Sequence, residues 1–128
     1  MSHRSRLYSA YVDVPQPVFE NSVRFYGELL GRAPKIDPEE PEYASYDGPP
    51  KAGIDLYVQA IGEDRPRVHL DIETDDVEAE VARLVALGAT EIERIHTWVV
   101  MNDPVGTVFC VIRVQDPERF DADAKRWD

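Results

Sequence analysis

The histidine best placed for chemistry lies in a short run of alternating side chains. Residues 68–73 alternate apolar and polar types, so His69, Asp71 and Glu73 share one side of an extended strand. An imidazole titrates near neutral pH and can act as a general acid or base. His69 is therefore the candidate catalytic residue, and Asp71 either orients its ring or contacts a ligand. The alternative for both residues is a structural hydrogen bond.

A second polar set alternates with apolar residues over 54–60, and aromatic residues occur on other extended runs. Aromatic side chains with polar tips can stack on a flat ligand, although at strand spacing they also serve as core residues. The predicted ligand-binding set is Tyr11, Asp55, Tyr57, Gln59, Asp71, Glu73 and Trp98.

The elements that carry these residues follow the same order twice. The first series is a strand at 7–14, a helix at 18–30, short strands at 33–36 and 42–46, and a strand at 54–60. The second is a strand at 68–73, a helix at 77–87, and strands at 90–95, 98–101 and 107–114. This pattern predicts one α+β domain over 1–128, with module one at about 7–60, a connector at about 61–66, module two at about 67–114 and a C-terminal tail at 115–128.

Local signals support these boundaries. The helix at 18–30 has an apolar stripe, and the residues that form it are Phe19, Val23, Tyr26 and Leu30, widened by Phe25 and Leu29. Gly31 is suited to end that helix, and Gly106 to a positive φ in a tight turn. Asp75 or Asp76 can cap the helix at 77–87. On the tail, Phe120 and Trp127 indicate either a short helix docked on the body or on a partner chain, or a frayed terminus.

Composition excludes several classes of protein. The 14 basic and 25 acidic residues among 128 give a net charge of −11, which argues against a nucleic-acid partner. No apolar run approaches the ~20 residues of a membrane span. The first residues, Met-Ser-His-Arg-Ser-Arg, are followed by no apolar run of the kind found in secretory signals, so we expect no such signal. Cys110 is the single cysteine, so an intramolecular disulfide is impossible. Unless Cys110 pairs between chains, a reducing, cytoplasmic location is expected. There is no glycine-rich phosphate loop and no Gly-x-Ser-x-Gly motif.

Several segments together resemble the vicinal oxygen chelate superfamily, the group of glyoxalases, bleomycin-resistance proteins and extradiol dioxygenases. They are Phe25-Tyr26-Gly27-Glu28-Leu29-Leu30-Gly31, the run 68–81, Leu87-Gly88-Ala89 and the run 103–110. The order and spacing are most similar to the glyoxalase-like domain group common in actinobacteria, over about residues 7–114. The resemblance implies two βαβββ modules whose mixed sheets curl around a concave cleft, with the helices outside. Under that arrangement the apolar residues of the strands at 54–60 and 68–73 meet the helices.

The resemblance also implies positions for a metal, one on the first and one on the last strand of each module. His69 matches a usual ligand, and Asp55 is a carboxylate shorter than glutamate. Ser9 occupies the first-strand position, with Tyr8 there if the register shifts, and Cys110 occupies the last-strand position. Asp55, His69 and Cys110 either bind a divalent ion (Zn, Ni, Co, Mn or Fe) or are the remnant of such a site. We expect the remnant, and hence no cofactor.

Three functions are consistent with this sequence. We favour a metal-independent small-molecule-binding protein of the antibiotic-sequestering kind, with the ligand near His69. The alternatives are a metal-dependent lyase, isomerase or dioxygenase using His69 and Asp55, and a non-catalytic interaction module. The resemblance implies a homodimer. An anionic ligand would use Arg67 or Arg113, but the acidic residues favour a cationic or polar neutral ligand.

Overall fold

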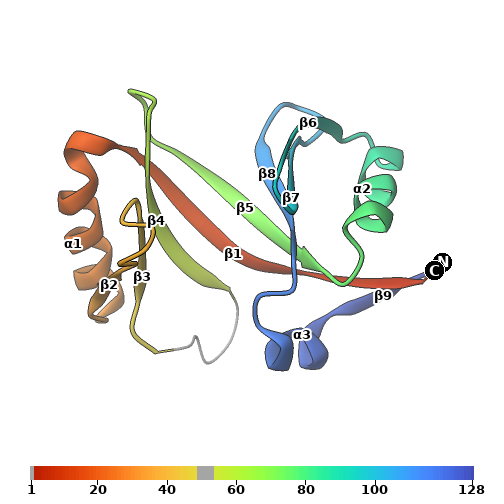
Figure 1. Cartoon of the computed structure of the whole chain (residues 1–128), viewed down its shortest axis with the longest axis horizontal. Coiled ribbons are helices and arrows are strands. Elements are labelled where there is room, and N and C mark those ends of the chain that lie inside the picture. The colour runs from red at the N-terminus through yellow and green to blue at the C-terminus, as the bar shows by residue number, and fades with distance from the viewer. Residues whose placement is uncertain (1, 49–53) are drawn as a thin grey trace. The chain divides into compact units, whose positions relative to one another are not determined.

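The computed structural model describes residues 2–48 and 54–128, and its elements are shown in Figure 1. Within these residues it contains three α-helices, one 3-10 helix and nine strands, so the chain is an α+β protein. The order β1-α1-β2-β3-β4 is followed by β5-α2-β6-β7-β8, which confirms the predicted repeat of one strand, one helix and three strands. None of the described helices is long and apolar enough to cross a membrane.

Backbone contacts divide the chain into two compact units. The central unit is Ser9–His69, and the terminal unit combines Met1–Tyr8 with Leu70–Asp128. Two long strands, β1 (His3–Pro15) and β5 (Arg67–Thr74), contribute residues to both units. The terminal unit is therefore assembled from two separate stretches of sequence.

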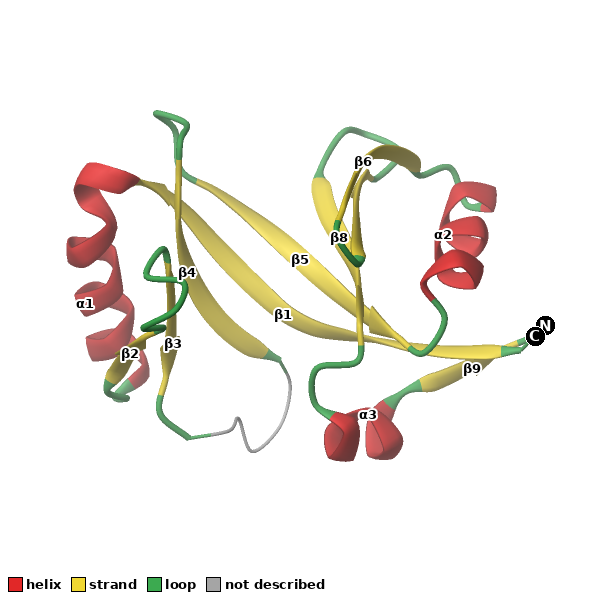
Figure 2. Ribbon diagram, viewed as in Figure 1, coloured by secondary structure: helices red, strands yellow, loops and turns green. Residues whose placement is uncertain are grey.

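The central unit is a mixed sheet with a helix on one face (Figure 2). Its remaining elements are η1 (Gln16–Val18), α1 (Phe19–Leu30), β2 (Pro34–Ile36), β3 (Tyr43–Tyr46) and β4 (Asp55–Ile61). The strand order is β2-β3-β4-β1, with the start of β5 next to β1, and β1 runs parallel to β4. Gly31 ends α1 in the left-handed conformation, with φ of 66°, as the sequence predicts.

The core of the central unit lies between α1 and this sheet. It contains Val12 and Val14 of β1, Phe19 and Val23 of α1, Ala44 and Tyr46 of β3, and Val58 and Ala60 of β4. The Tyr46 hydroxyl donates a hydrogen bond of 2.8 Å to the backbone oxygen of Val23 and so joins sheet to helix. Phe25 and Leu29 were expected to widen the buried stripe of α1, and this is wrong. They are 53% and 61% exposed because the sheet covers a narrower arc of the helix.

The terminal unit repeats this arrangement with a second helix. Its further elements are α2 (Val77–Ala86), β6 (Thr90–Ile95), β7 (Trp98–Asn102), β8 (Val108–Arg113), α3 (Pro117–Asp123) and β9 (Lys125–Trp127). The strand order is β5-β8-β7-β6, with β5 parallel to β8 and β9 antiparallel to the start of β1. The core comprises Val81 of α2, Val99 and Met101 of β7, and Val111 of β8. Asp76 is the residue that caps α2, because its side chain accepts a 3.0 Å hydrogen bond from the backbone amide of Ala79.

The apolar side chains of β5 are more exposed than the sequence predicts. Val68 and Leu70 are 56% and 38% exposed, whereas His69 and Asp71 are buried. The helix α2 packs on β6, β7 and β8, and none of its core partners comes from β5. Alternation shows which residues share a side of a strand, but it does not show which side another element covers. The expectation that Val68 and Leu70 meet a helix is therefore wrong.

The C-terminal tail is docked and not frayed. Phe120 of α3 is only 1% exposed. The indole nitrogen of Trp127 donates a 2.9 Å hydrogen bond to the Ser5 hydroxyl, and the Arg83 guanidinium lies 3.9 Å from the centre of the Trp127 ring. Of the two alternatives that the sequence left open, the structure supports docking.

Candidate functional site

The face of the central sheet that is turned away from α1 carries a stack of three rings. Tyr11 of β1 and Tyr57 of β4 are direct partners in the parallel ladder, and their ring centres are 4.9 Å apart at an interplanar angle of 20°. The His69 ring stacks on Tyr11 as well, with centres 4.7 Å apart and an angle of 10°. Because β1 lies between β4 and β5, Tyr11 is the middle ring of the stack.

Asp13 holds the imidazole of this stack. One oxygen of its carboxylate, Oδ2, lies 2.6 Å from Nδ1 of His69 and 3.2 Å from Nε of Arg67. The Asp13 side chain is 1% exposed, and its second oxygen has no hydrogen-bond partner among the described residues. When Nδ1 of a neutral imidazole donates to a carboxylate, Nε2 is the accepting nitrogen of the ring. Asp13 therefore favours the tautomer that a general base or a hydrogen-bond acceptor needs.

The rest of this face is polar and aromatic. The amide nitrogen of Gln59 donates a 3.1 Å hydrogen bond to the hydroxyl of Tyr43. The rings of Tyr43 and Tyr11 form a T-shaped pair, with ring centres 6.2 Å apart and planes at 84°. We refer to Tyr11, Asp13, Tyr43, Tyr57, Gln59, Arg67 and His69 as the aromatic face. It offers flat π surfaces with hydroxyl, amide and carboxylate groups around them, which suits a planar polar molecule.

The structure brings together some of the predicted residues on this face. Tyr11, Tyr57 and His69 are in direct contact, and Gln59 lies on the same side of β4 as Tyr57. Asp55 shares that side and is the ladder partner of Ser9.

The other predicted residues belong to the terminal unit. Asp71 of β5 is the direct ladder partner of Cys110 in β8, and both are buried. Glu73 is fully buried and accepts hydrogen bonds from Arg6 Nε at 2.5 Å and from the backbone amide of Gln115 at 2.7 Å. These contacts fasten β5 to β1 and to the start of the tail. Trp98 lines a separate cavity near the start of α2.

Sequence reasoning missed Asp13 as a site residue, although residues two apart in a strand share a side, which places Asp13 with Tyr11. The missing fact was the strand order, because Asp13 reaches His69 only if β1 lies beside β5. Tyr43 was missed because it belongs to a short strand in a proline-rich stretch whose facing was not predicted.

The metal positions implied by the resemblance do not form a usual ligand set in the central unit. Ser9 and Asp55 are direct ladder partners, and Ser9 is buried with its hydroxyl unpartnered among the described residues. Serine is a poor ligand for these ions, and Nδ1 of His69 is engaged by Asp13. No group of three His, Cys, Asp or Glu donors gathers wholly within the described part of this unit, whereas a catalytic site needs about three protein ligands. Cys110, the remaining position, belongs to the terminal unit.

Comparison of the sequence with protein families gives one clear match. The Glyoxalase-like domain family matches residues 9–112, which span both repeats of the fold. The chain is therefore a member of the glyoxalase-like domain family, within the vicinal oxygen chelate fold. No curated protein matches its sequence.

Solved structures with the same fold include enzymes of different kinds. One is described as an NAD-dependent benzaldehyde dehydrogenase from Legionella pneumophila, with 17% identity, a TM-score of 0.59, and coverage of 84% of this chain and 98% of that one. Methylmalonyl-CoA epimerase from Mycobacterium tuberculosis matches with 13% identity and a TM-score of 0.56, covering 88% and 90%. The epimerase from Streptomyces coelicolor, in complex with 2-nitronate-propionyl-CoA, matches with 14% identity and a TM-score of 0.53, covering 87% and 98%. At these identities the likeness establishes the fold alone.

Proposed function

We propose that this protein binds a planar, polar or cationic small molecule on the aromatic face of its central unit, next to His69, without a metal ion. The observation that carries the proposal is the stack of Tyr57, Tyr11 and His69, anchored by the 2.6 Å contact between His69 and Asp13. Such a stack presents π surface whose orientation is fixed before a ligand arrives, which reduces the entropy lost on binding.

The charges on the face support the preference for a cationic or neutral ligand. Asp13 and Asp55 carry two carboxylates, and Arg67 supplies one guanidinium that already contacts Asp13 and Glu63. An aromatic cation stacked on tyrosine gains cation–π attraction in addition to the burial of its ring. An anion would instead lie near two carboxylates and a single guanidinium that already contacts Asp13 and Glu63.

Calorimetric titration with proflavine, a planar aromatic cation, tests the binding proposal. We expect saturable binding, and we expect Tyr11→Leu to weaken it about fivefold, because loss of the middle ring removes the stacking that orients Tyr57 and His69, worth about 1 kcal/mol. Phe25→Leu is the matched control, since it removes an exposed aromatic ring from α1 on the opposite face of the sheet. Proflavine that does not saturate, or that binds equally well to the Tyr11→Leu variant, would refute the proposal.

The absence of a metal requirement needs its own measurement. The untagged protein is incubated with zinc, nickel, cobalt, manganese or iron(II), passed through a desalting column and analysed for metal per chain. We expect no retained stoichiometric metal and the same proflavine affinity before and after treatment. Near-stoichiometric metal that is lost in His69→Ala would overturn this part of the proposal and favour the metal-dependent enzyme, in which His69 and Asp55 are the ligands that the resemblance implies.

A further inference from the structure

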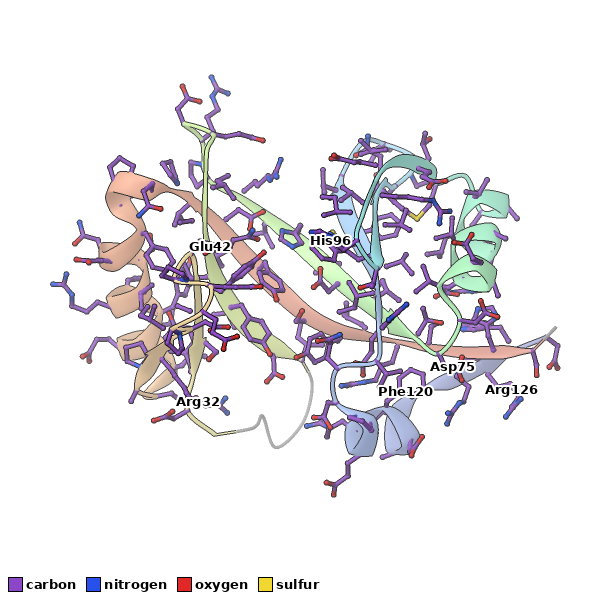
Figure 3. The ribbon with its side chains drawn as sticks, in the orientation of Figure 1. Arg32, Glu42, Asp75, His96, Phe120 and Arg126 are labelled. Carbon is purple, nitrogen blue, oxygen red and sulfur yellow. The ribbon has the colours of Figure 1, made fainter. Side chains whose placement is uncertain are left out.

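The terminal unit contains a cavity that shares no residue with the aromatic face. It has a volume of about 590 Å³ and opens beside the start of α2. Four segments line it: the end of β5 with the first turn of α2, the end of β6 with the turn that follows, the start of β7, and the end of β8. Figure 3 labels Asp75 and His96, which belong to the first and second of these segments. The volume is suited to a ligand of one or two rings.

The acidic side chains of this cavity are already engaged by the protein. Asp75 accepts hydrogen bonds from the backbone amide of Arg4 at 2.7 Å and from its Nε at 3.0 Å. Burial raises the pKa of Asp75, but these bonds outweigh burial and hold the pKa below its usual value. Glu78 is paired with Arg94, which lowers the pKa of Glu78 as well. Asp76 caps α2. Each of these carboxylates is therefore already engaged in a hydrogen bond or ion pair within the protein.

Arg113 is the basic residue of the cavity that the fold leaves available. It is the last residue of β8, opposite Thr74 of β5, and it is exposed. Its backbone oxygen accepts from Gln115, but its guanidinium forms no hydrogen bond or ion pair with the described residues. Arginine stays protonated at all physiological pH values and presents a planar fork that matches a carboxylate. A cationic fork at a cavity wall is suited to bind an anionic group.

An aromatic wall stands in the same cavity. The rings of His96 and Trp98 lie with their centres 5.7 Å apart and their planes at 56°. His96 has a φ of 50°, and it is the one described non-glycine residue in the left-handed region. That conformation is unfavourable for an L side chain, and such residues are concentrated at functional sites. Here the turn places His96 next to the half-buried Trp98, which offers a ligand a flat surface.

We propose that this cavity is a second binding site, which takes a small aromatic carboxylate. The aromatic ring packs on Trp98 and His96, and the carboxylate binds the guanidinium of Arg113. The two sites differ in charge preference, because the aromatic face favours cations and this cavity favours anions. The inference is independent of the proposed function, since none of its residues belongs to the central unit.

Nuclear magnetic resonance of the indole N–H groups tests this site directly. The chain has two tryptophans, Trp98 and Trp127, so a spectrum of Trp127→Phe assigns the Trp98 signal. The probe is 2-naphthoate, and 2-naphthamide is its neutral counterpart of the same shape. We expect 2-naphthoate to move the Trp98 signal saturably and to bind about tenfold more tightly than 2-naphthamide, because a charge-assisted bidentate contact is lost in the amide.

Two arginine variants make the test specific. Arg113→Gln removes the proposed anion contact and should weaken 2-naphthoate about tenfold while leaving 2-naphthamide unchanged. Arg126→Gln is the matched control, since Arg126 is an exposed arginine of β9 outside the cavity whose guanidinium bonds the Ser2 hydroxyl. An unchanged Trp127 indole signal and unchanged backbone amide signals away from the substituted residue show that each variant is folded. The proposal is overturned if the Trp98 signal does not move, if acid and amide bind equally, or if Arg113→Gln binds like Arg126→Gln.

Discussion

The buried ion pair between Arg6 and Glu73 makes the strongest prediction about stability. Glu73 is completely buried, and the Arg6 side chain is 9% exposed, with Nε at 2.5 Å from a carboxylate oxygen. The second carboxylate oxygen accepts the backbone amides of Gln115 and Asp116 at 2.7 and 3.3 Å. Glu73→Gln keeps the shape and one acceptor oxygen but removes the negative charge. It therefore leaves the Arg6 guanidinium buried without its counter-ion.

Breaking a buried pair from one side costs about 3–5 kcal/mol. We expect the lower end, about 3 kcal/mol, because the Arg6 guanidinium also lies 5.7 Å from the centre of the Tyr8 ring, which offers partial compensation. For a chain of this length, 1 kcal/mol corresponds to about 3–5 °C, so Tm should fall by about 10–15 °C. Urea unfolding followed by far-ultraviolet circular dichroism measures the free energy, and a thermal scan gives Tm.

Two further variants separate charge burial from general disruption. Arg94→Gln breaks the exposed pairs with Glu78 and Glu91 and should have no measurable effect, because solvent screens such pairs. The double variant Arg6→Met with Glu73→Met removes both charges and should recover most of the stability lost in Glu73→Gln. The reasoning is refuted if Glu73→Gln loses less than about 1 kcal/mol or behaves like Arg94→Gln.

Three other predictions concern pH and a helix terminus. Burial raises the pKa of Glu80, but hydrogen bonds from Arg83, Ser5 and His3 outweigh burial and hold the pKa of this carboxyl below its usual value of 4.5. The free energy of unfolding should therefore fall as pH drops below about 4.5. Urea titrations at acid pH should show a smaller dependence of this free energy on pH in Glu80→Gln. Burial, with a smaller contribution from Tyr26, raises the pKa of Tyr46 to about 12. An ultraviolet titration should therefore show a late-ionising phenol that is absent in Tyr46→Phe. Ionisation of Tyr46 should destabilise the fold as pH rises toward 12. Asp76→Ala should cost about 1 kcal/mol by uncapping α2, whereas Asp76→Ser should retain most of that stability; equal urea midpoints for the two would contradict the capping role.

The sequence was sufficient for the order of elements because each strand and helix has its own local signal. Alternation separated Val12 and Val58, which are core residues, from Tyr11 and Tyr57, which stack on the other face. Glycines after the helices and in the turn at 102–106 marked positions with positive φ, as Gly31 and Gly106 show.

The contacts of the candidate site could not be predicted in the same way, because they depend on which strands are neighbours. Asp13 and His69 are 56 residues apart in sequence and meet only through the pairing of their strands. Glu73 had the same local pattern as His69, yet it is an internal ion-pair residue because Arg6 and the tail approach it. Local patterns do not contain that information, and the exposure of Val68 and Leu70 was missed for the same reason.

The division of β1 between the two units has a consequence for the order of folding. During synthesis the whole central unit, Ser9–His69, precedes most of the terminal unit, so its local contacts can form while residues 3–8 still lack partners. The pairing of His3 with Trp127 closes a loop of nearly the entire chain, and it carries the largest entropic cost of closure among the described strand pairs. Docking of the tail should therefore be a late, non-local step in folding. A chain that lacks its first eight residues would retain every residue of the central unit but lose a strand from the terminal one.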